Sequence, residues 1–82
     1  MIQIGVKLFA GAREAAGCER VVVSVALPAT IQDLRQQLAV EVPALQPLAS
    51  KLLFAKGTAY VADATPLAAG DELAAFPPVS GG

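Results

Sequence analysis

The chain has 82 residues, of which 55% are apolar and 16% charged, and its formal net charge is −1. Its six basic residues are scattered, and no basic run alternates with aromatic residues, which excludes the usual kind of nucleic-acid-binding surface. A single domain this apolar can build a core without a disulfide or a structural metal. No apolar run approaches the length of about 20 residues that a membrane-spanning helix needs.

The residues with catalytic potential are few. The chain has no histidine and only one cysteine, Cys18, which we expect to be a partly buried or loop thiol. A lone cysteine fits a reducing compartment and no signal segment opens the sequence, so we expect a cytoplasmic protein. The carboxylates are spread thinly, and the adjacent pair Asp71 and Glu72 is expected in a turn and at a strand start. We expect this chain alone to catalyse nothing and to bind no metal.

The first quarter of the chain predicts two strands. Residues 1–10 alternate in hydropathy, and the apolar face holds Ile2, Ile4, Val6 and Leu8. This period of two predicts a half-buried strand. Residues 12–16 are good helix formers but too few for a stable helix, so we expect one helical turn. Residues 20–27 place β-branched side chains at alternate positions and predict a second strand, which Pro28 ends.

One amphipathic helix of about three turns is predicted after Thr30. Thr30 is a good N-cap, and Asp33 adds a negative charge to the first turn, in the manner of a capping box. Apolar residues then recur at helical spacing, at Ile31, Leu34, Leu38 and Val42. This stripe needs a sheet to pack against, and the helix ends near Pro43.

The second half predicts three more strands. Residues 43–50 are expected as a loop or an irregular turn of helix. Residues 51–56 and 59–62 predict a hairpin with Gly57 in its tight connection, and residues 72–76 predict the last strand. The pattern alone indicates an α+β domain with one sheet and one principal helix.

The end of the sequence has an unusual composition. Its residues are Phe76, Pro77, Pro78, Val79, Ser80, Gly81 and Gly82. Two prolines cannot donate backbone hydrogen bonds and fix φ, so we expect the chain to leave the sheet after Phe76 as a stiff stem. The small residues that follow can enter a narrow slot, and their notable chemical group is the ionised α-carboxylate of Gly82. The plain alternative is a frayed terminus without function.

This ending, preceded by residues 67–73, resembles that of the small subunits of molybdopterin synthase, a branch of the MoaD/ThiS family of ubiquitin-like sulfur carriers. The likeness extends more weakly to residues 7–14, to the helix start at 30–35 and to residues 51–53. Thiamine-pathway carriers of the family also end in Gly-Gly but usually lack the proline pair. The chain departs from the family at two positions, at Gly57 in place of the usual Asn and at Ala75 in place of a frequent second aromatic residue.

The resemblance implies a ubiquitin-like β-grasp in residues 1–76, with a mixed sheet of about five strands and one principal helix, followed by an extended tail, 77–82. It implies that a ubiquitin-activating-type adenylyltransferase uses ATP to adenylate Gly82, and that a persulfide sulfur donor converts this end to a thiocarboxylate. The tail would then enter the large catalytic subunit of molybdopterin synthase, with which the chain forms a heterotetramer, and give its sulfur to the pterin precursor. By the same resemblance the chain itself binds no cofactor.

Several side chains are left open between core and surface. Four apolar residues could either form an exposed face beside the tail or belong to the core: Leu8, Phe9, Leu73 and Phe76. For the hairpin residues Phe54 and Tyr60, three interpretations are equally open: they belong to the core, cover the surface or contact a partner. Arg13, Arg35 and Lys51 are expected as solvated cover of the helix and sheet.

Three other functions remain open at this point. The chain could be a sulfur carrier of another pathway, such as thiamine or thionucleoside synthesis, although Pro77 and Pro78 argue against thiamine. It could be a protein modifier, in which Gly82 forms an isopeptide bond with lysines. It could also be a plain β-grasp interaction domain with an idle tail.

Overall fold

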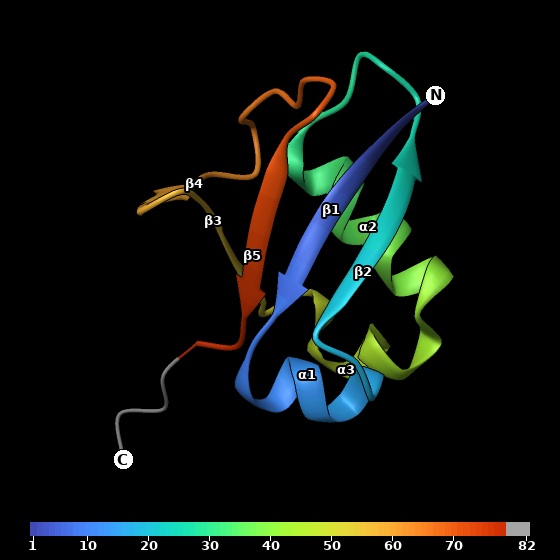
Figure 1. Cartoon of the computed structure of the whole chain (residues 1–82), viewed down its shortest axis with the longest axis vertical. Coiled ribbons are helices and arrows are strands. Elements are labelled where there is room, and N and C mark those ends of the chain that lie inside the picture. The colour runs from blue at the N-terminus through green and yellow to red at the C-terminus, as the bar shows by residue number, and fades with distance from the viewer. Residues whose placement is uncertain (79–82) are drawn as a thin grey trace.

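The computed structural model describes residues 1–78, and Figure 1 shows one sheet with a long helix behind it. Five strands pair in the order β2-β1-β5-β3-β4. In chain order they are β1 (Ile2–Leu8), β2 (Arg20–Val25), β3 (Leu53–Lys56), β4 (Ala59–Val61) and β5 (Glu72–Phe76). The helices are α1 (Ala10–Ala16), α2 (Ile31–Glu41) and α3 (Gln46–Ala49), and a 3-10 turn, η1 (Pro43–Leu45), precedes α3.

The first and last strands lie side by side in the middle of the sheet. β1 pairs antiparallel with β2 and parallel with β5, and β5 pairs antiparallel with β3. A parallel pair of strands requires a long connection between them, and α2 lies within that connection (Figure 1). The mixed sheet with one principal helix confirms the predicted α+β class.

Some element boundaries differ from the prediction. α1 spans seven residues rather than one turn, because tertiary packing buries Ala12 completely. Gly17 ends this helix in the left-handed conformation, with its N–H bonded to the Arg13 carbonyl at 2.9 Å. Residues 43–50 form η1 and α3, which is the irregular helical alternative of the prediction. β1, β2 and β3 are each shorter than predicted, since the chain turns into α1 at Phe9 and bends away after Val25.

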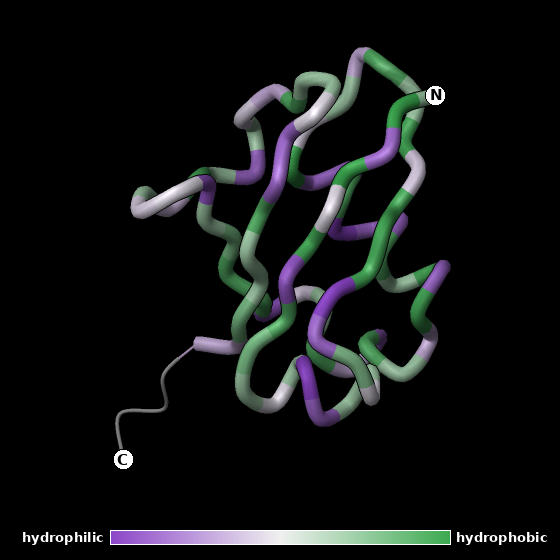
Figure 2. The backbone as a smooth tube through the Cα atoms, in the orientation of Figure 1, coloured by the Kyte–Doolittle hydropathy of each residue, from purple (hydrophilic) through white to green (hydrophobic). Residues whose placement is uncertain are grey.

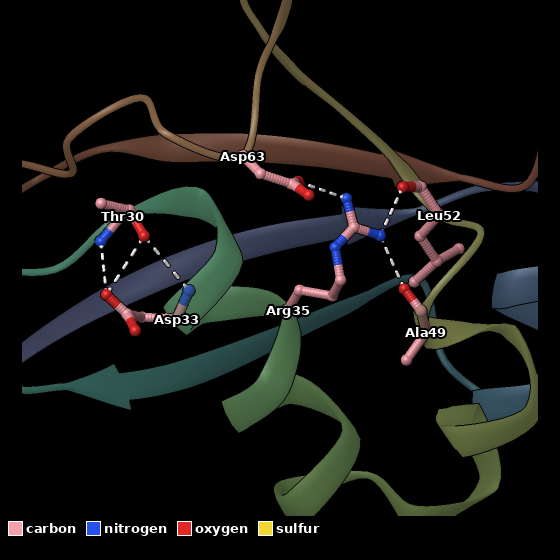
Figure 3. A network of polar contacts seen from close by, with 6 residues as sticks. All are labelled: Thr30, Asp33, Arg35, Ala49, Leu52 and Asp63. Atoms are coloured by element: carbon pink, nitrogen blue, oxygen red, sulfur yellow. Dashed lines mark hydrogen bonds and ion pairs between the residues drawn. The ribbon is translucent and has the colours of Figure 1, made fainter.

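The predicted capping box of α2 is present (Figure 3). The Thr30 hydroxyl accepts a hydrogen bond from the backbone N–H of Asp33, and the Asp33 carboxylate accepts one from the N–H of Thr30 at 2.9 Å. Ile31, Leu34 and Leu38 are buried, as their spacing predicted. Among the described helices, none has both the length and the apolar character needed to cross a membrane.

The core lies between α2 and one face of the sheet. Along β1, hydrophobic and hydrophilic residues alternate, as Figure 2 shows. The largest fully buried side chains are Phe54, Ile4, Leu8, Ile31, Leu34, Leu38, Leu45, Leu52, Leu73, Val6 and Val23. Leu8, Leu73 and Phe54 are therefore core residues, and the hypothesis that Leu8 and Leu73 form an exposed face is wrong. Their side chains point to the α2 side of the sheet because they occupy alternate strand positions to Phe9 and Phe76.

The prediction that Arg35 is solvated is wrong, because only 14% of its side chain is exposed. Figure 3 shows the guanidinium held at the junction of three segments. One nitrogen, Nη1, donates to the carbonyls of Ala49 at 2.6 Å and Leu52 at 2.7 Å, and Nη2 lies 2.7 Å from the Asp63 carboxylate. The same group lies 5.1 Å from the centre of the Phe54 ring. Arg35 thus ties α2 to the start of β3 and to the turn after β4.

Candidate functional site

β5 ends at Phe76, at the point where the sequence predicted that the chain leaves the sheet. Phe76 is half-buried and pairs with Leu53 of β3, and the N–H of Phe9 bonds to the carbonyl of Ala75 at 3.2 Å. Pro77 and Pro78 follow outside any strand. The remaining predicted site residues, Val79, Ser80, Gly81 and Gly82, lie outside the described residues. The described part of the site is therefore the sheet end from which the tail continues.

Three aromatic rings surround this end of the sheet. The Phe9 ring lies edge-to-face against Phe76 with the ring centres 6.5 Å apart, and the Tyr60 ring does the same at 5.5 Å. Phe9 is 46% exposed and Tyr60 69% exposed. Phe9, Tyr60 and Phe76 are named here the aromatic surface. They come from the start of α1, from β4 and from β5, so the topology alone brings them together.

The aromatic surface extends onto β3. Leu53 is 39% exposed and lies directly across from Phe76 in the β3–β5 pair. Large exposed apolar side chains that gather on one surface of a small protein indicate a docking site for another protein. Of the four residues left open between core and surface, Phe9 is exposed and Phe76 is half-buried, whereas the exposed Leu53 was missed. The signal that identifies Leu53 is the strand register, which the sequence pattern does not give.

The start of α1 supports the proline stem. Gly11 lies next to Pro77, and a Cβ at Gly11 would stand 3.8 Å from the Pro77 ring, which is ordinary contact distance. Pro77 is half-buried and Pro78 is exposed. The stem therefore begins against the body of the domain and reaches its surface within two residues.

An ion pair crosses the open face of the sheet. Arg20 of β2 donates from Nε and Nη2 to the Glu72 carboxylate of β5 at 2.8 and 3.0 Å, and the pair spans the intervening strand β1 at Gly5. A Cβ at Gly5 would collide with both side chains, so glycine makes room for the bridge. The hydrogen bonds from Arg20 hold the pKa of Glu72 below its ordinary value, and the same bonds raise the pKa of Arg20.

Asp71 is a structural residue of the turn before β5, as the sequence predicted. Its carboxylate accepts from the Ala68 N–H at 2.8 Å and lies 2.8 Å from the Lys56 ammonium. The hydrogen bond from Lys56, followed by the one from Ala68, lowers the pKa of Asp71. Ala68 lies in the turn before β5 and Lys56 lies in the β3–β4 hairpin, so Asp71 links the turn to the hairpin.

Within residues 1–78, no group of three histidine, cysteine, aspartate or glutamate side chains gathers that could hold a metal ion. Cys18 is exposed in the connection between α1 and β2. The described residues thus provide an apolar surface for docking and a support for the stem.

The sequence matches known proteins over nearly its whole length. The model of the ThiS family matches residues 6–82. The chain is 41% identical over 81 residues to the molybdopterin synthase sulfur carrier subunit of Escherichia coli K12, covering 96% of this chain and 99% of that protein. It is 33% identical over 81 residues to the protein of the same name from Arabidopsis thaliana, covering 99% of this chain and 84% of that protein.

The fold also matches a solved structure. The chain superposes on small archaeal modifier protein 1 of Haloferax volcanii with a TM-score of 0.85 and 34% identity, covering 96% of this chain and 100% of that one. The likeness confirms that the five-stranded mixed sheet and its helix form a ubiquitin-like β-grasp.

Proposed function

The chain belongs to the ThiS family, and we propose that it is the sulfur carrier and non-catalytic small subunit of a molybdopterin synthase. The observation that carries the proposal is its likeness to the Escherichia coli carrier subunit over almost the full length of both chains. The presence of Pro77 and Pro78 before Gly81 and Gly82 supports this branch of the family over thiamine-pathway carriers.

The proposed chemistry takes place at the carboxylate of Gly82. A carboxylate is a poor electrophile, so an adenylyltransferase of the ubiquitin-activating type first joins it to AMP from ATP and releases pyrophosphate. The terminal sulfur of a persulfide then displaces AMP, and a thiol reduces the resulting acyl disulfide to leave a thiocarboxylate. In the large catalytic subunit the thiocarboxylate sulfur forms a C–S bond with the pterin precursor, and water then hydrolyses the bond between this sulfur and the Gly82 carbonyl, which returns Gly82 to a carboxylate.

The composition of the tail suits this role. From Pro78 to Gly82 an extended chain reaches about 15 Å at ~3.3 Å per residue, which is enough to cross the wall of a partner's pocket. Gly81 and Gly82 lack a Cβ, so no side chain hinders the reacting carbonyl. No side chain of this chain is assigned a catalytic role, and ATP is bound by the activating partner rather than by this chain.

The aromatic surface serves the same purpose at the body of the domain. We propose that the large subunit and the activating enzyme each hold the carrier by Phe9, Tyr60, Phe76 and Leu53, so that the tail enters their active sites. Two of these side chains, Phe9 and Tyr60, leave 46% and 69% of their surface exposed, which docking would remove from water. The carrier and the large subunit would form a heterotetramer.

A second candidate function is conjugation to other proteins. It is favoured by the 34% identity to small archaeal modifier protein 1 over almost the whole chain. In that case the activated carbonyl of Gly82 would be attacked by a lysine amine and form an isopeptide bond, with loss of AMP. A carrier for thionucleoside synthesis would use the same thiocarboxylate and differ only in the acceptor.

Intact-mass spectrometry distinguishes these functions. The chain is incubated with a ubiquitin-activating-type enzyme, ATP and a persulfide donor, and a variant that stops after Ser80 serves as the control. A sulfur-for-oxygen mass gain located at Gly82 supports a sulfur carrier. Covalent adducts with other proteins support a modifier, and an unchanged mass contradicts both functions.

A further inference from the structure

A positively charged pocket adjoins the aromatic surface. It has a volume of about 400 Å³ and is lined by Lys7, Leu8, Phe9, Arg13, Glu19 and Arg20. These residues come from the end of β1, from α1 and its N-cap Phe9, and from the start of β2 with Glu19 just before it. Phe9 belongs to both the pocket and the aromatic surface, so the two are continuous. The lining holds three cations and one carboxylate in a chain whose formal net charge is −1.

Two of the three cations already have a carboxylate partner. Arg20 is bound through two nitrogens to Glu72, and Arg13 lies 3.6 Å from Glu19. The Arg13 and Glu19 side chains are 53% and 83% exposed, so this contact is loose and readily exchanged. Within residues 1–78, Lys7 forms no ion pair.

The strand register places the positive charge of Lys7 in an unfavourable position in the isolated chain. Lys7 lies directly across from Arg20 in the β1–β2 pair, and like charges at directly opposed positions destabilise a sheet. Its neighbour on the other side is Ala74 of β5, which offers no charge. Glu72 is near enough for Lys7 to lower its pKa, but its carboxylate oxygens are bound by Arg20. A carboxylate from outside the chain would remove this imbalance.

We propose that this pocket receives an aspartate or glutamate side chain of the large subunit. The carboxylate of that side chain would pair with the Lys7 ammonium, and its methylene groups would pack against Phe9. This inference rests on the proposed function, since it names the chemistry of the partner at the same docking face. A protein carboxylate fits better than a free phosphate. Phosphate sites converge several unoccupied N–H donors, whereas here the Arg20 donors are already committed to Glu72.

The pocket would add orientation to the aromatic surface. Apolar contacts at Phe9 and Phe76 are not directional, whereas an ion pair at one side of them fixes how the carrier is rotated on its partner. Rotation matters because the stem begins at Pro77, beside α1, and the tail must point into the partner's active site. Lys7 is therefore a positioning residue for the tail.

The test uses the full chain and the large subunit of the same organism's molybdopterin synthase. Affinity is measured by calorimetry at about 50 mM and about 300 mM NaCl for the wild type, Lys7→Glu, Lys7→Arg and Lys51→Glu. Lys51 is the matched control, because it is exposed, forms no ion pair within residues 1–78 and lies outside the pocket. At low salt we expect Lys7→Glu to weaken binding about tenfold and Lys7→Arg and Lys51→Glu to stay within about twofold. The loss in Lys7→Glu should shrink at high salt.

A carbodiimide provides an independent readout, because it joins an amine to a contacting carboxylate as an amide with loss of water. In the wild-type complex we expect a cross-link between Lys7 and an Asp or Glu of the large subunit, which Lys7→Arg abolishes without loss of affinity. If the wild type binds the large subunit but Lys7→Glu and Lys51→Glu bind it with equal affinity, this inference is overturned and the proposed function stands. The same holds if the wild-type complex forms no Lys7 cross-link. Failure of the wild type to bind the large subunit overturns both.

Discussion

Replacing Arg35 by methionine tests how the body of the domain is held together. Methionine keeps the length of the apolar stem and removes the guanidinium, which binds the carbonyls of Ala49 and Leu52 and the carboxylate of Asp63. The substitution leaves both carbonyls without their side-chain donor at a site where the Arg35 side chain is only 14% exposed.

The magnitude follows from these contacts. A buried polar group that loses its partner costs about 1–3 kcal/mol. The Leu52 carbonyl loses its Arg35 donor, and the Ala49 carbonyl keeps a long hydrogen bond of 3.4 Å from the Leu52 N–H. The pair with Asp63 adds little, because that carboxylate is 55% exposed and is hydrated without Arg35. We expect Arg35→Met to lower the free energy of unfolding by about 2–4 kcal/mol, from a total of about 4–12 kcal/mol for a chain of this length. The Tm should fall by about 10–20 °C.

Urea unfolding followed by far-UV circular dichroism measures this change. The matched control is Arg13→Met, because the Arg13 side chain is 53% exposed and makes one loose contact of 3.6 Å. It should stay within about 0.5 kcal/mol of the wild type. Equal midpoints for Arg35→Met and Arg13→Met would refute the reasoning that the Arg35 guanidinium ties α2 to the start of β3.

Three further substitutions test other parts of the account. Gly5→Ala should displace the Arg20–Glu72 bridge while keeping the fold, so the pKa of Glu72 should rise toward its ordinary value; an unchanged carboxyl titration by NMR would contradict the steric role of Gly5. Because the native pKa of Asp71 is lowered, its contribution to stability is present above its ordinary pKa of 3.8 and is lost as pH falls through the lowered value. Asp71→Asn should therefore be less stable than the wild type at neutral pH and lose less stability on acidification, as urea midpoints at several pH values would show; parallel curves would count against it. Tyr60→Ala should weaken binding of the large subunit about tenfold and change the free energy of unfolding by less than about 1 kcal/mol, and unaltered affinity in calorimetry would remove Tyr60 from the docking surface.

The sequence pattern was most informative where one local period decides the structure. The last strand occurs at the predicted residues, 72–76, and α2 begins at its capping box, because both signals lie within a few neighbouring residues. The alternation in residues 1–10 placed Leu8 on the apolar face, but the prediction still grouped Leu8 with Phe9 as candidates for one exposed face, and of the two Phe9 is exposed. The alternation could not show that Phe9 and Phe76 share a face, since this depends on the parallel pairing of β1 with β5.

The errors arise from contacts between distant segments. Arg35 looks solvated in a helical pattern, but its partners are two carbonyls and a carboxylate up to 28 residues away. The bridge between Arg20 and Glu72 joins residues 52 apart and depends on Gly5 in the strand between them. Neither arrangement has a local signal, because the sheet order that creates it is a property of the whole chain.

Sulfur transfer from a charged carrier tests the central proposal most directly. The chain is charged to the Gly82 thiocarboxylate, mixed with the large subunit and the pterin precursor, and followed by intact mass, with Gly81→Ala as the variant that hinders the tail. We expect the wild type to return to the carboxylate as the dithiolene forms, with a pair of carriers used for each dithiolene, and Gly81→Ala to be charged or discharged slowly while remaining folded. A wild-type thiocarboxylate that persists in the presence of a bound large subunit and precursor would contradict the central proposal.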